Sequence, residues 1–256
     1  MALFKTSNPA LGEKTFDGNQ GLQYGGTIDA TERMTMNGTV NKTGILLVLA
    51  MASAMWTWMQ FMQSQDMGAI SGWMLLGFFG GFIVALVTIF KKEWAPVTAP
   101  IYALLEGLAL GGISAFYNLR THGIAIQAVG LTFGTLFVML FLYRSGMIRV
   151  TQKFRIGVIA ATGGIALFYI AEMILGFFGV QFTTINGSGI IGIGFSLLVV
   201  GIAALNLVLD FDFIEHGVNA GAPKYMEWYG AFGIMVTLVW LYLEMLRLLS
   251  KLNSRN

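Results

Sequence analysis

Seven long apolar runs follow one another along the chain and leave few possible folds. A transmembrane helix needs roughly 20 mostly apolar residues to cross about 30 Å of hydrocarbon. Strands of a membrane barrel would instead alternate polar and apolar residues over about 10 positions. The sequence therefore predicts an all-α membrane protein with seven transmembrane helices in the lipid bilayer. The runs are Thr43–Met62, Ala69–Phe90, Val97–Tyr117, Ile124–Tyr143, Ile156–Phe178, Gly189–Leu209 and Tyr229–Leu249.

Composition excludes several other classes of protein. Only 11% of the 256 residues are charged, whereas soluble domains carry about 25%. The net charge of +2 is too small to indicate nucleic-acid binding. The chain has no cysteine, which excludes disulfide scaffolds and thiolate metal sites. Zincin, nucleophile-elbow and P-loop patterns are missing from the sequence, and no GxGxxG string opens a helix after a predicted strand, so we expect neither an enzyme nor a cofactor.

The polar residues divide the chain into three parts. Residues 1–42 form a polar N-terminal arm, residues 43–250 the membrane domain, and residues 251–256 a short polar tail. A cleaved signal peptide would place its apolar core within about the first 15–30 residues. Because the first apolar run begins only at Thr43, we expect that span to remain as a signal anchor.

Basic residues are concentrated on one side of the predicted bundle. Cytoplasmic loops of membrane proteins carry more Lys and Arg than the opposite loops. The arm has four basic residues, the loop at 91–92 two and the loop at 144–155 four, whereas the opposite loops have only Arg120. This pattern predicts a cytoplasmic N-terminus in a cell membrane, with a bacterial cytoplasmic membrane as the expected location. Seven crossings would export a C-terminal basic cluster, so either the last span is broken or the upstream charges override that cluster, which comprises Arg247, Lys251 and Arg255.

Glycines recur at spacings of three and four residues inside the spans. Such small residues let helix backbones approach closely in membranes, so we expect tight helix contacts at most of them. They include Gly77, Gly107, Gly111, Gly163 and Gly164.

Carboxylates inside the apolar spans are the residues most informative about function. Each charged group at mid-span costs about 2.5–3.5 kcal/mol on insertion scales and must face a partner or water. No lysine lies deep in any predicted span, so these acids are expected to stay protonated, to share a proton or to hold a cation. Each of these states indicates H⁺ or metal-ion traffic. The acids are Glu106, Glu172, Asp210, Asp212 and Glu244.

Each acid also has a purely structural interpretation. For Glu106 two interpretations are equally supported: a carboxyl group that lines an ion pathway, or a protonated carboxyl that is hydrogen-bonded to a backbone carbonyl. For Glu172 the structural interpretation is favoured. Asp210 and Asp212 point about 200° apart on a helix, so only one can face the bundle centre. For Asp212, Glu215 and His216, the favoured interpretation is that they lie at a hydrated helix end. Glu244 could form an ion pair with Arg247 three residues on.

Two strings near the C-terminus carry a family resemblance. "LNLVLDFDFIEHG" followed by "WLYLEMLRLLSKLN" resembles the paired acidic signature of the Bax inhibitor-1 family. "APIYALLEGLALGGISAFY" is similar to its glycine-bearing third helix, and "NPALGEKTF" and "MTMNGTVNKTG" are similar to the bacterial YccA-type branch with a long N-terminal arm. The similarity covers about residues 34–250, together with the arm. Here Phe211-Asp212 follows the first acid in place of the family's Thr-Gln, and Ala69–Phe90 contains no arginine.

The resemblance implies six helices around a central seventh and a pH-sensitive Ca²⁺ leak. It implies that Asp210 and Glu244 correspond to the family's two gating acids, which share a proton or hydrogen bond. Two adjacent buried carboxyls cannot both ionise cheaply, and Ca²⁺ prefers oxygen ligands. We therefore predict a Ca²⁺ leak channel in which Asp210 and Glu244 sense pH and contact Ca²⁺, with Glu106, Asp212 and Glu172 along the ion pathway.

Two other functions are compatible with the sequence. The protein could regulate a membrane protease or another membrane partner, as the YccA-type resemblance suggests, with residues 1–42 as the recognition arm. It could also be a proton-coupled transporter, which the charge pattern does not distinguish from a leak channel.

Overall fold

The structure, a computed structural model, describes residues 32–179 and 183–254. In this part of the chain seven helices are long and apolar enough to cross a membrane, which confirms the predicted all-α fold. Two short elements join them, the 3-10 turn η3 (Lys92–Trp94) before α4 and the helix α7 (Thr183–Asn186) before α8. The seven long helices are α2 (Met36–Ser64), α3 (Met67–Phe90), α4 (Ala95–Arg120), α5 (Ile124–Arg144), α6 (Gln152–Phe177), α8 (Ile190–Asn219) and α9 (Met226–Asn253).

Side-chain caps explain where several of the helices begin. The Thr35 hydroxyl accepts a hydrogen bond from the backbone N–H of Gly38 at 3.0 Å, and Asp66 and Thr151 cap α3 and α6 in the same way. The cap at Thr35 starts α2 at Met36, so this helix includes the end of the segment predicted as a polar arm. The arm's residues 1–31 lie outside the described residues.

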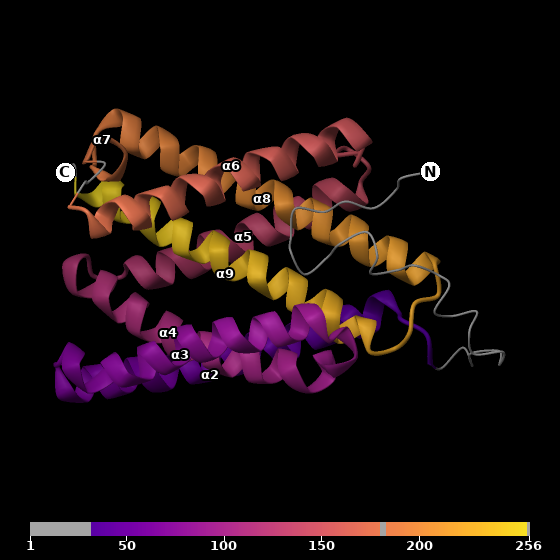
Figure 1. Cartoon of the computed structure of the whole chain (residues 1–256), viewed down its shortest axis with the longest axis horizontal. Helices are drawn as coiled ribbons and strands as arrows, with labels where there is room; N and C mark the ends of the chain where they lie inside the picture. Colours follow the sequence, from indigo (N-terminus) through magenta and orange to yellow (C-terminus); the bar gives the residue numbers. More distant parts are fainter. Residues whose placement is uncertain (1–31, 180–182, 255–256) are drawn as a thin grey trace.

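Helix α9 lies at the centre of the bundle and is the most buried of the seven spans. It contacts α2, α4, α5 and α8, whereas α3 packs mainly on α4 and α6 packs on α8. Figure 1 shows α9 (yellow) running between a layer of α2, α3 and α4 and the helices α6 and α8. The predicted central seventh helix is therefore present, with α3 and α6 towards the outside. It is continuous from Met226 to Asn253, so the last span is not broken.

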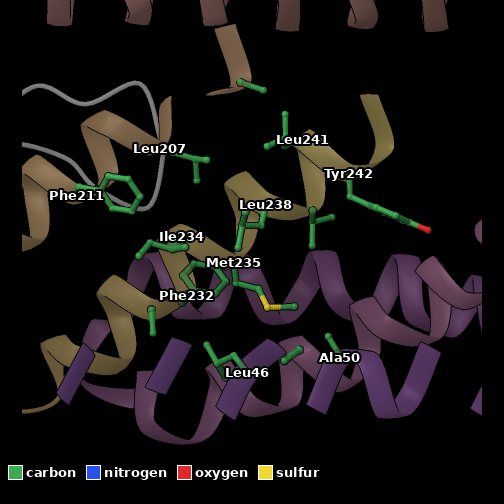
Figure 2. Close-up of a cluster of buried hydrophobic side chains, with 14 of the residues drawn as sticks. Leu46, Ala50, Leu207, Phe211, Phe232, Ile234, Met235, Leu238, Leu241 and Tyr242 are labelled. Atoms are coloured by element: carbon green, nitrogen blue, oxygen red, sulfur yellow. The ribbon is translucent and has the colours of Figure 1, made fainter. Parts of the chain in front are cut away.

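The hydrophobic core is built on α9. Phe232, Met235 and Leu238 of α9 are buried together with Leu46 of α2 and Leu207 of α8. Figure 2 shows the α9 side chains between those of α2 and those of α8. This packing holds α9 against both neighbours and fixes which of its faces meets α8.

Glycines bring α2, α3 and α4 into close contact. A Cβ added at Gly77 would lie 2.5 Å from a backbone oxygen of α4, and one at Gly107 or Gly111 would collide with backbone oxygens of α2. Only glycine therefore permits these helix crossings. By contrast, a Cβ at Gly163 or Gly164 in α6 would meet nothing within 4 Å among the described residues, so the close packing expected at those two positions does not occur in this part of the chain.

Candidate functional site

Polar side chains occupy the seam between the antiparallel helices α8 and α9. The Thr237 hydroxyl donates to Asp210 Oδ2 at 2.5 Å, and Lys251 Nζ donates to Ser196 Oγ at 2.9 Å. Ser196 and Asp210 are as far apart along α8 as Thr237 and Lys251 are along α9. Both contacts therefore fit one register between the two antiparallel helices. In that register Glu244 of α9 lies opposite Ala203 of α8, midway between the two hydrogen bonds. We call this row of residues the α8–α9 seam.

Asp210 and Asp212 face different helices, as their spacing predicts. Asp210 is 1% exposed and points to Thr237 of α9. The Asp212 carboxylate points to α6, where Arg155 donates to Oδ2 at 2.5 Å. Asp212 is also buried, so the hydrated helix end expected here is wrong for Asp212. Long arginine side chains that reach inwards from a helix end explain this burial.

Glu244 is almost completely buried and only half of its carboxyl is hydrogen-bonded. Its Oε1 accepts from the Tyr169 hydroxyl of α6 at 3.0 Å and from Arg247 at 2.9 Å. Its Oε2 is buried without a hydrogen-bond partner. The predicted ion pair with Arg247 is therefore present. A buried carboxyl oxygen without a partner needs a proton, a water or a cation.

Asp210 and Glu244 lie at two different depths of the bundle. Glu244 follows Thr237, the partner of Asp210, by two helical turns, which corresponds to roughly 10 Å along the helix axis. The hydrogen bonds to the Glu244 carboxyl come from Tyr169 and Arg247. A hydrogen bond between the two acids is therefore not a feature of this conformation, and their joint role as a gate stays a prediction.

The two remaining predicted acids lie away from Asp210. A Cβ added at Gly81 of α3 would lie 3.0 Å from Glu106 Oε2, so the Glu106 carboxyl packs at the α3–α4 contact. Glu172 of α6 accepts a hydrogen bond from the Asn186 side chain of α7. Within the described ranges, no group of three or more His, Cys, Asp or Glu side chains could hold a metal ion. Ca²⁺ contact by Asp210 and Glu244 stays a prediction.

A buried acid at the start of α9 did not appear among the predicted site residues. Glu227 is 0% exposed and accepts from the backbone N–H of Thr35 at 2.8 Å and from its hydroxyl at 2.7 Å. Lys42 and Lys224 both form ion pairs with it. We call these four residues the Glu227 clamp. In the sequence, Thr35 and Lys42 fall in the predicted arm, and Lys224 and Glu227 fall in a predicted loop. The spacing of Thr35 and Lys42 would place both on one face of a helix.

The chain just before α2 is also joined to the turn between α8 and α9. The backbone N–H of Met34 donates to the Ala222 carbonyl at 2.7 Å, and that of Lys224 donates to the Glu32 carbonyl at 2.8 Å. Together with the Glu227 clamp, these bonds fix the entry to α2 against the loop that connects the two seam helices.

Comparison with known proteins gives one match. A family model described as "Bax inhibitor 1 like" matches residues 8–254, which is nearly the whole chain and includes every seam residue. No curated protein and no solved structure matches.

Proposed function

The chain belongs to the Bax inhibitor 1 like family, and we propose from this that it is a pH-sensitive Ca²⁺ leak channel of a bacterial cytoplasmic membrane. In this proposal ions move along the α8–α9 seam, and Asp210 and Glu244 gain and lose the protons that control the leak. The N-terminus would be cytoplasmic, as the basic loops predict.

The observation that carries the proposal is the unpartnered Oε2 of Glu244. Acids within membrane spans face partners or water and mark ion and proton pathways. This oxygen is buried, and the register inferred for α8 and α9 places Ala203, whose side chain cannot hydrogen-bond, opposite Glu244. A proton, a water molecule or a cation bound to Oε2 would supply the partner that this oxygen lacks.

The rest of the seam supplies further oxygen atoms on both sides of Glu244. Asp210 and Thr237 lie towards one membrane face, and Ser196 lies towards the other. Ca²⁺ prefers carboxylate, hydroxyl and carbonyl oxygens, which are the ligand types present. In the conformation described here, Arg247 neutralises Glu244, so we interpret this conformation as closed.

Ca²⁺ flux into proteoliposomes tests the proposal. The wild-type protein should pass Ca²⁺ in a pH-dependent way, and Glu244→Gln and Asp210→Asn should change both the size of the flux and its pH dependence. Glu215→Gln is a matched control, because Glu215 is an exposed acid at the end of the same helix as Asp210. Flux that is absent, or that is the same in the two seam variants as in the control, would contradict the proposal.

A regulatory role is a second candidate, and the Glu227 clamp favours it. A partner such as a membrane protease that bound the N-terminal arm would pull on a segment joined directly to α9. Deletion of residues 1–31 leaves the clamp residues in place and should abolish co-purification of such a partner. Retained partner binding after this deletion would count against recognition through the arm.

A further inference from the structure

The ammonium group of Lys251 is buried in a cage of three oxygen atoms at one end of the α8–α9 seam. Lys251 is 7% exposed. Its Nζ donates to the carbonyl of Ile185 at 2.7 Å, to the carbonyl of Gly192 at 3.1 Å and to the hydroxyl of Ser196 at 2.9 Å. All three acceptors are neutral. Buried lysines are usually paired with an acid, so this environment is unusual for a simple structural charge.

The backbone around the cage is arranged so that two carbonyl oxygens converge on one point. Ile185 belongs to the four-residue helix α7, which lies near the C-terminal end of α9 in Figure 1. A Cβ added at Gly192 would lie 2.8 Å from the Ile185 carbonyl oxygen. Glycine at position 192 therefore allows the end of α7 to approach α8 closely enough for both carbonyls to reach the same cation.

The cage is aligned with the acids of the seam. Lys251 follows Glu244 by two helical turns and Arg247 by one, and it shares the buried face of α9 with Glu244 and Thr237. Along α9, a cation that moved from Glu244 towards this end of the bundle would pass Arg247 and then reach the Lys251 ammonium. Fixed positive charges of this kind act as electrostatic barriers to cations in channels.

We propose that the three oxygens form a binding site for a monovalent inorganic cation, and that the Lys251 ammonium is its tethered occupant. Rings of neutral carbonyl and hydroxyl oxygens replace the hydration shell of such ions in channels. When Lys251 leaves the cage, Na⁺ or K⁺ takes its place and the seam opens at this end. The closing role rests on the proposed leak function, whereas the cation site itself does not.

Binding is tested first without transport. Lys251→Met keeps the side chain as far as the ε position and removes the terminal ammonium group, which vacates the cage. In detergent, K⁺ or Na⁺ should raise the Tm of this variant in a saturable way relative to N-methylglucamine, and adding Ser196→Ala should weaken the effect. Wild type, Lys251→Arg and the exposed-lysine control Lys153→Met should show no specific rise. A Tm of Lys251→Met that is independent of K⁺ and Na⁺ overturns the proposed site.

A second variant covers the case in which Lys251→Met does not fold. Lys251→Ala removes the last three carbons and the ammonium, which propylammonium replaces atom for atom. Propylammonium should stabilise Lys251→Ala and leave Lys153→Ala unchanged, whereas tetramethylammonium should have no effect. Equal responses of the two variants to propylammonium overturn the proposal.

Flux then tests the closing role. Proteoliposomes with Lys251→Met should leak K⁺ and Ca²⁺ several-fold faster than wild type, and propylammonium should slow the leak of Lys251→Ala. If wild type shows the Glu244-dependent flux but Lys251→Met does not exceed it, the closing role is wrong and the proposed function stands. If cation binding is present but wild type never leaks, the leak function is wrong and the cation site stands.

Discussion

The Glu244 carboxyl group accepts hydrogen bonds from residues of two helices, Tyr169 of α6 and Arg247 of α9. Arg247 donates to Oε1 of Glu244, and it also donates to the Tyr169 hydroxyl at 2.5 Å. The guanidinium also lies 4.9 Å from the centre of the Tyr169 ring, within the range of a cation–π contact. Arg247 therefore joins α9 to α6 while it neutralises the acid.

Replacing Arg247 should destabilise the bundle. Arg247→Gln leaves the Glu244 carboxyl buried without its cation, and such uncompensated groups cost about 1–3 kcal/mol. We expect a loss of this size in the free energy of unfolding in detergent. The larger loss typical of fully buried ion pairs is not expected, because the Arg247 side chain is 38% exposed. Combining Arg247→Gln with Glu244→Gln should recover part of the loss. Arg144→Gln, at an exposed arginine that ends α5, is the control, and equal losses in the two single variants would contradict this account.

At the scale of single helices, small residues determine which pairs pack closely. Gly107 and Gly111 bring α4 against the backbone of α2, and Gly77 brings α3 against α4. The three helices lie together on one side of α9 in Figure 1. The glycines of α6 lack such neighbours, and α6 touches the rest of the bundle mainly through α8.

Two alanine substitutions should separate these two classes of glycine. Gly107→Ala forces a methyl group into the α2 backbone and should cost about 1–3 kcal/mol of unfolding free energy, as overpacked cores do. Gly163→Ala adds the same group in open space and should stabilise α6 by about 0.5–1 kcal/mol through helix propensity. Unfolding in a denaturing detergent measures both. A Gly107→Ala variant as stable as Gly163→Ala would show that the α2–α4 contact can relax.

The Glu227 clamp should behave as one unit that joins α2 to α9. Glu227→Gln removes a fully buried carboxylate from Lys42 and Thr35, and breaking a buried ion pair costs about 3–5 kcal/mol. We expect the free energy of unfolding to fall by an amount near the lower end of this range, because Lys224, the second cation paired with Glu227, is 48% exposed and stays solvated. In a double-mutant cycle, Lys42→Gln should add little to Glu227→Gln. Fully additive losses would contradict the clamp, and Glu93→Gln at an exposed acid is the control.

At the scale of the whole molecule, the apolar runs are enough to predict the seven helices, and no predicted span extends more than one residue beyond its helix. The helices themselves are longer than the predicted spans, and α8 continues from the predicted end at Leu209 to Asn219. The site is only partly predictable. The spacing of Asp210 and Asp212 shows that they face different ways, but the register between α8 and α9 depends on packing that no single helix encodes. For the same reason the reach of Arg155 to Asp212, and the burial of Glu227 and Lys251, could not be read from local sequence. Asp212 and Glu244 have the basic partners Arg155 and Arg247, which lie near the ends of spans, so the lack of lysines deep in the spans does not predict them.

The sidedness of the bundle is open to direct measurement. Because the chain contains no cysteine, a single introduced thiol is the only reactive one. With a cytoplasmic N-terminus, His122→Cys between α4 and α5 should react with a membrane-impermeant maleimide in intact cells. Ser145→Cys between α5 and α6 should react only after the cells are opened. The reverse pattern would invert the proposed orientation and place the Lys251 cage on the cytoplasmic side.

The Glu227 clamp also has a consequence for biosynthesis. Thr35 and Glu227 are separated by 192 positions in the chain, so the ribosome makes nearly the whole protein before Glu227 can meet α2. Until then Lys42, near the start of α2, has no Glu227 carboxylate to neutralise it. In a nascent chain that stops before α9, the Lys42 ammonium and the Thr35 backbone N–H both lack the Glu227 carboxylate, so the contact between the two ends of the membrane domain is among the last to form.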